Sequence, residues 1–168
     1  MTFAILFAYA FIANVALAVV PHEPVVVWYG AHAGAWSTAV VATAGTVAAS
    51  WVDHRLFATA ISKAAERSDV ARAVRPMLSL FRRAPFAVIA ASGLTPFPFF
   101  PFKAMAFAAR YPRFRYLVAV AAGRFPRYAL LAWLGEVVTI PAWAFVVCFL
   151  ALLTPSLRAF RWHRQSAK

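Results

Sequence analysis

The stretch Gly93-Leu-Thr-Pro-Phe-Pro-Phe-Phe-Pro-Phe-Lys103 decides the fold, because it places three prolines inside a strongly apolar run. The run extends over 85–109 and is long enough for a membrane span by hydropathy alone. Each proline removes a backbone N–H and disfavours helical geometry in the residue before it. A continuous helix is therefore excluded, and broken backbone at membrane depth needs protein or water to satisfy it.

Basic residues flank this run on both sides. Arg82 and Arg83 precede it, and the cations that follow it are Arg110, Arg113 and Arg115. Because lysine and arginine mark cytoplasmic loops, both ends of the run are expected on the cytoplasmic side. A segment that enters and leaves through one face has not crossed the membrane. We therefore predict a re-entrant hairpin over 85–109.

The composition indicates a membrane protein. The 168 residues are 64% hydrophobic and 13% charged, whereas soluble domains are about 45–50% apolar. The net charge of +12 raises nucleic-acid binding as an alternative. Because the cations lie in clusters between apolar segments, we expect topology signals and no nucleic-acid partner. The single Cys148 and the spacing of the histidines predict no disulfide, no metal site and no cofactor.

The other apolar segments predict an all-α integral membrane protein, with residues 1–168 as one domain. Four segments have the length of transmembrane helices: 3–20, 36–52, 116–134 and 137–154. The first competes with a signal peptide, because Ala16-Leu-Ala18 resembles a cleavage site, but it lacks a positively charged start. A basic tail, 155–168, follows the last span. With each hairpin returning to its own face, every basic loop and both termini fall in the cytoplasm.

Two further segments are not expected to cross. Residues 21–35 begin Pro21-His-Glu-Pro24, and the apolar run within them is too short for a span. They form either an extracytoplasmic loop or a second re-entrant hairpin, which inserts from the opposite face and carries Glu23 into the membrane. His22 is expected to be an interfacial polar residue or part of a proton path. Residues 56–83 place apolar side chains at helical spacing beside six cations, which predicts an amphipathic helix in the headgroup plane.

Ionisable residues within the apolar segments are the candidate functional groups. Arg124 and Arg127 lie on one face of 116–134, about 12 Å from its nearer end, which is too deep for snorkelling. A lipid-facing arginine costs about 2.5–3.5 kcal/mol, so both are expected to face the protein interior or a wet cavity. Lys103 lies in the proline-rich hairpin. Asp53 closes segment 36–52 and either pairs with a cation elsewhere or is exposed to water.

Four phrases occur in a defined order along the chain: Pro21-His-Glu-Pro24, Gly45 to Asp53, Leu94 to Lys103, and Gly123-Arg-Phe-Pro-Arg127 to Gly135. Together they resemble the VTT-domain superfamily, which comprises DedA-like and SNARE-associated Golgi proteins, and within it the short bacterial members. The resemblance covers about residues 5–153. It implies a fold with two oppositely inserted re-entrant hairpins related as an inverted repeat.

The resemblance also implies a function. Members of the superfamily are linked to the flipping or scrambling of anionic phospholipids and of polyprenyl phosphates such as undecaprenyl phosphate. They are also linked to membrane homeostasis driven by the proton-motive force, here in a bacterial inner membrane. Glu23 matches the acid of the family's first hairpin, and Asp53 matches the acid after the following helix. Many DedA members carry arginines where this chain has Ser92 to Thr95, so Lys103 is the only cation in its hairpin.

The predicted substrate-binding residues are Glu23, Asp53, Lys103, Arg124 and Arg127, with no catalytic residue and no enzymatic activity. Cations at membrane depth would replace water around a lipid phosphate, and protonation of Glu23 would couple transport to a proton gradient. Membrane lipids are therefore the expected partners, with protons as a candidate coupling ion and a homo-oligomer left open. The alternatives are a static ion-pair network and a non-transporting scaffold or assembly factor for membrane homeostasis.

Overall fold

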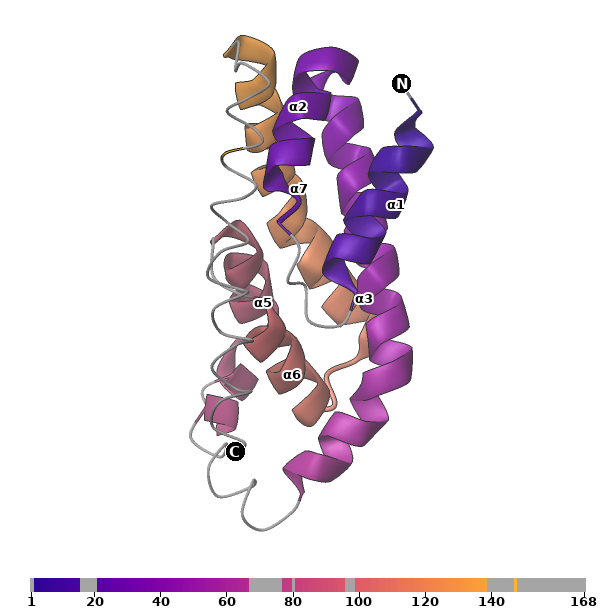
Figure 1. The fold of residues 1–168 in the computed structure, drawn as a ribbon. Coiled ribbons are helices and arrows are strands. Elements are labelled where there is room, and N and C mark those ends of the chain that lie inside the picture. Colours follow the sequence, from indigo (N-terminus) through magenta and orange to yellow (C-terminus); the bar gives the residue numbers. More distant parts are fainter. Residues whose placement is uncertain are drawn as a thin grey trace.

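The computed structural model describes residues 2–15, 21–66, 77–79, 81–95, 99–138 and 147. Every regular element within these residues is helical, as predicted (Figure 1). The elements are α1 (Phe3–Asn14), α2 (Glu23–Ala33), α3 (Ala35–Ala65), α5 (Pro85–Leu94), α6 (Phe100–Ala108) and α7 (Arg113–Val137).

Two of the described helices, α3 and α7, are long and apolar enough to cross a membrane. At 1.5 Å per residue, the 31 residues of α3 extend about 46 Å and the 25 residues of α7 about 38 Å, against a hydrocarbon core of about 30 Å. They pack against each other along the bundle. The other four helices have 9 to 12 residues, which gives each about half the hydrocarbon thickness.

Helices α1 and α2 run in opposite directions and meet near mid-height of the bundle (Figure 1). α1 starts at the end of the molecule where α2 turns into α3, and it ends at Asn14. It packs closely on α3 at Gly45, where a Cβ atom would lie 2.7 Å from the Phe7 carbonyl oxygen. α2 then returns to Gly34, whose φ of 85° allows the sharp turn into α3.

Helices α5 and α6 repeat this arrangement from the opposite end of the bundle. α5 begins near the turn between α6 and α7, where the Phe81 ring contacts Tyr111 edge to face, and it runs to mid-height. α6 starts again at mid-height and returns toward Arg110. α5 packs closely on α7 at Gly123, where a Cβ atom would lie 2.2 Å from the Ala90 carbonyl oxygen.

The helix boundaries differ from the predicted ones in two places. The helix predicted over 3–20 ends at Asn14, where the next residue is extended, and residues 16–20 lie outside the described part. α3 does not end at residue 52 but continues to Ala65, and residues 53–65 contain no proline or glycine that would end the helix. Residues 56–65, about the first third of the predicted amphipathic helix, are therefore part of α3. The helical segment Met77–Arg83 meets α5 at a bend of 98°.

The predicted last span and tail lie almost wholly outside the described residues. In the described part, two apolar clusters fill the two halves of the bundle. One cluster joins α1 and α2 to α3 and α7: Leu6, Ala10, Val26, Tyr29, Ala39, Ala42, Tyr128 and Ala132. The other joins α5, α6 and α7: Phe81, Ile89, Phe99, Ala106, Phe107, Tyr116, Ala119 and Val120.

The outer surface of the bundle is also apolar. Large hydrophobic side chains stand at least 63% exposed on three of the helices, α1, α3 and α7: Ile5, Ile12, Trp36, Leu56, Phe114 and Leu130. Exposed apolar side chains of this size, in such number, are typical of a surface that contacts lipid or another protein. Together with the two long apolar helices, this surface indicates a membrane protein.

Candidate functional site

The structure brings the five predicted site residues together in a polar layer between the two apolar clusters. Four helices contribute to this layer. Glu23 opens α2, Asp53 lies within α3, and Lys103 lies in α6. Arg124 and Arg127 face inward from α7, as predicted: Arg124 is buried and Arg127 is largely so. Because the four short helices all begin or end here, the layer also contains the free backbone groups of the helix breaks.

Lys103 and Asp53 form a fully buried ion pair. The ammonium donates to Asp53 Oδ2 at 2.5 Å, and the two side chains are only 3% and 0% exposed. Lys103 also donates to the carbonyl oxygen of Asn14 at 3.2 Å, so it satisfies the last residue of α1. Asp53 therefore pairs with a cation, the first of the two predicted alternatives.

Arg127 makes the corresponding contacts in the other half of the layer. Its Nη2 donates to Glu23 Oε1 at 2.7 Å, and its Nη1 donates to the carbonyl oxygen of Thr95 at 2.7 Å, just past the end of α5. This pair is more accessible than the first, with side-chain exposures of 16% for Arg127 and 27% for Glu23. The Glu23 carboxylate also accepts the backbone N–H of His22 at 3.1 Å.

The two ion pairs are arranged crosswise and with opposite polarity. In one, the cation of α6 binds the acid of α3; in the other, the acid of α2 binds the cation of α7. Each pair therefore ties the second short helix of one half to the long helix of the other half. Each cation also binds a carbonyl oxygen at the end of another short helix: Lys103 at the end of α1, and Arg127 just past the end of α5. The ion pairs and these hydrogen bonds together hold the four short helices to one another.

Arg124 differs from the other two cations. Its side chain is 4% exposed, and its Nε has no hydrogen-bond partner among the described residues. The guanidinium carbon lies 5.0 Å from the centroid of the Phe99 ring, a cation–π contact. No carboxylate of the described residues forms an ion pair with it. Three cations thus face two carboxylates, which leaves one excess positive charge in a buried layer.

Polar groups other than the five predicted site residues complete the layer. His22 Nε2 and Tyr128 Oη lie 2.5 Å apart, and the Tyr128 hydroxyl is 3.1 Å from Thr46 Oγ1. His22 is buried within the protein. The signals that could have found these groups are its position beside Glu23 between two prolines, and the position of Tyr128 directly after Arg127.

Among the described residues, no group of three His, Cys, Asp or Glu side chains is placed to hold a metal ion. Comparison of the chain with protein-family models, with curated proteins and with solved structures finds no match. The chemistry of the layer itself is therefore the basis for a functional assignment. Its main property is a buried guanidinium that lacks a protein counterion in the described part of the chain.

Proposed function

We propose that this protein moves or scrambles a lipid with a phosphate-bearing headgroup across a bilayer. The observation that carries this proposal is the buried Arg124 side chain, which has no carboxylate partner among the described residues. A buried cation is costly unless an anion compensates it. Phosphate oxygens match the geometry of a guanidinium, and a phosphodiester would neutralise the one excess charge of the layer.

In this proposal, α3 and α7 cross the membrane, and the pairs α1–α2 and α5–α6 are re-entrant hairpins inserted from opposite faces. The half-length helices and their antiparallel courses support this placement. So does the packing pattern, in which α1 lies on α3 as α5 lies on α7, and α2 lies on α7 as α6 lies on α3. These contacts support the proposal that the two halves are related as an inverted repeat.

This placement revises the topology that we predicted from the sequence. The first hairpin consists of α1 and α2, so the start of the described chain shares a face with Gly34 (Figure 1). If the arginine-rich turns at the other end of the bundle are cytoplasmic, the start of α1 faces away from the cytoplasm. The bilayer midplane then coincides with the polar layer.

The layer offers an anion two kinds of donor. Arg124 supplies a guanidinium, and α2 and α6, whose first turns have no side-chain cap, both begin near mid-height with their N-termini at the layer. Glu23 forms an ion pair with Arg127. Protonation of Glu23 would release Arg127 for a phosphate, which would couple lipid movement to a proton gradient. The buried pair of Lys103 and Asp53 holds the hairpins in place throughout.

A lipid-translocation assay tests this proposal. The full chain is reconstituted in liposomes with phosphatidylglycerol labelled on an acyl chain, and dithionite quenching measures exposure of the label in the outer leaflet. Arg124→Gln should lower the rate by about tenfold or more, because a charged hydrogen bond to phosphate contributes about 1.5–3 kcal/mol. Arg115→Gln, an exposed cation on the same helix, should keep the wild-type rate.

A folded Arg124→Gln variant with the wild-type rate would refute the assignment of this site. The variant Glu23→Gln distinguishes the transport proposal from the alternative of a static ion-pair network. A network that only stabilises the fold predicts lower stability with an unchanged response to pH, whereas the transport proposal predicts that the rate loses its dependence on a proton gradient. If the folded wild-type protein moves none of the phospholipids or polyprenyl phosphates tested, this result favours the alternative of a non-transporting scaffold.

A further inference from the structure

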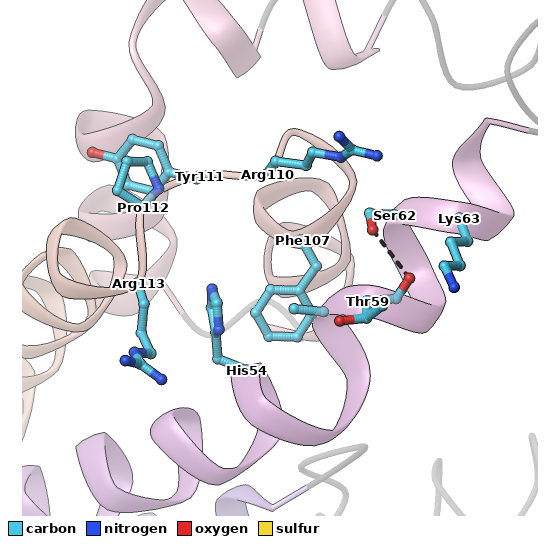
Figure 2. A pocket seen from close by; sticks show the side chains of 10 residues that line it. His54, Thr59, Ser62, Lys63, Phe107, Arg110, Tyr111, Pro112 and Arg113 are labelled. Atoms are coloured by element: carbon cyan, nitrogen blue, oxygen red, sulfur yellow. Dashed lines mark hydrogen bonds between the residues drawn. The ribbon is translucent and has the colours of Figure 1, made fainter.

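A second basic site lies at the arginine-rich end of the bundle, away from the polar layer. It is a pocket of about 470 Å³ formed by the last turns of α3, the end of α6 and the turn into α7 (Figure 2). Its volume falls in the range of small-ligand pockets, about 300–1,000 Å³. The polar side chains that line it are His54, Thr59, Ser62, Lys63, Arg110 and Arg113.

The charge of this lining is entirely positive. Lys63, Arg110 and Arg113 contribute three cations, and no acid is among the described residues that line the pocket. Arg110 pairs with Glu66, but the two side chains are 68% and 60% exposed, and an exposed pair of this kind exchanges readily. The pocket is therefore complementary to an anion that carries more than one charge or several oxygens.

The backbone supports this interpretation. Arg110 has a φ of 53°, the left-handed region in which glycine is usual after a helix. The turn is closed by hydrogen bonds from Arg110 N to Phe107 O at 3.0 Å and from Tyr111 N to Ala106 O at 2.9 Å. A glycine would close the same turn without steric cost. A strained position occupied by arginine indicates a need for its charge.

A lipid source for the anion is favoured by a neighbouring cavity. Other faces of the same two helices, α3 and α6, border an apolar cavity of about 330 Å³ whose lining includes Ile61, Met77 and Met105. An acyl chain can fill this apolar cavity, whereas a free phosphate ion would gain nothing from binding there. The end wall of the basic pocket is also partly apolar, since Phe107 contacts His54 edge to face with centroids 5.3 Å apart.

We infer that this basic pocket binds the phosphate group of an anionic lipid headgroup on the arginine-rich side of the membrane. In this position the headgroup would be held before it reaches the central layer. The role of the pocket as a loading position rests on the proposed function, whereas its affinity for a phosphate group can be measured without any transport. Arg113 and Lys63 would bind the phosphate oxygens from opposite walls, α7 and α3.

Calorimetry on the purified full chain in neutral detergent tests the pocket. The probes are dihexanoyl phosphatidic acid, inorganic phosphate, and dihexanoylglycerol as the phosphate-free control. Wild-type protein should bind the dihexanoyl phosphatidic acid and should not bind the dihexanoylglycerol. Arg113→Gln should weaken binding about tenfold or more by removing a charge-assisted contact. Arg115→Gln makes the same change at an exposed position that does not line the pocket and should leave affinity within about twofold.

Thr59→Glu serves as a second variant, because this exposed residue of the wall tolerates substitution and a carboxylate there would repel the phosphate. Inorganic phosphate binding that Arg113→Gln also weakens would support a site for the phosphate group alone. Binding of phosphatidic acid without inorganic phosphate would support a site for the whole headgroup. Wild-type affinity in both Arg113→Gln and Thr59→Glu, or equal binding of the phosphate-free control, would overturn the inference. Arg124→Gln should keep this binding while losing lipid movement, so the two proposals can fail separately.

Discussion

Removal of the Asp53 carboxylate is predicted to destabilise the fold more than removal of the Glu23 carboxylate. The ion pair with Lys103 is 2.5 Å long, and its side chains are 0% and 3% exposed. Asp53→Asn keeps the shape of the side chain but removes the negative charge that pairs with the buried Lys103 ammonium, which also donates to the Asn14 carbonyl oxygen. Breaking a buried pair in this way costs about 3–5 kcal/mol. Glu23→Gln, at a pair with exposures of 27% and 16%, should cost about 1–2 kcal/mol.

A double-mutant cycle separates the pair from its surroundings. Lys103→Met alone should cost about 3–5 kcal/mol, because it leaves the carboxylate buried. The double variant Asp53→Asn/Lys103→Met contains neither charge and should return to within about 2 kcal/mol of wild type. Unfolding by titration with sodium dodecyl sulfate in mixed micelles, followed by tryptophan fluorescence, measures each free energy. A loss below about 1 kcal/mol for Asp53→Asn, or a double variant as unstable as the sum of the single ones, would refute this reasoning.

The same titration checks three further predictions. Tyr128→Phe should cost about 1–3 kcal/mol because it leaves His22 without its hydroxyl partner, and a neutral result would mean that this contact contributes nothing. Gly123→Val should cost at least about 3 kcal/mol, since its Cβ would lie 2.2 Å from a backbone oxygen of α5. The exposed Ala122→Val should change stability by no more than about 0.5 kcal/mol, and equal losses at both positions would contradict the close packing of α5 on α7. Arg110→Gly should raise stability by about 0.5–1 kcal/mol by relieving the positive φ, and Arg110→Ala should not.

The sequence was sufficient to predict features that depend on local chemistry. Proline lacks the backbone N–H of a helix interior, so the break between α5 and α6 is readable in the stretch that ends at Lys103. The inward orientation of Arg124 follows from the cost of an arginine in lipid, and the structure buries it. The helical fold and the two helices of membrane-spanning length were likewise readable from composition and length.

The remaining features depend on contacts between distant parts of the chain. The local sequence does not predict that α1 ends at Asn14, because the first proline after this residue is Pro21. The polar residues after Asp53 predicted the end of a span there, yet α3 continues to Ala65. The carboxylate can be buried because it pairs with Lys103, which lies 50 residues away in the sequence. Such a pairing has no periodic or compositional signal.

Cysteine accessibility tests most directly the central claim that two half-length hairpins enter from opposite faces and meet at the polar layer. Single cysteines at Thr2, Ala31, Ala84 and Pro112, all exposed, are introduced into a Cys148→Ser background and labelled with a membrane-impermeant maleimide from each side. Thr2 and Ala31 should react from one side only, and Ala84 and Pro112 from the other side only. Labelling of Thr2 and Ala31 from opposite sides would show that the chain crosses the membrane between them and would contradict the account.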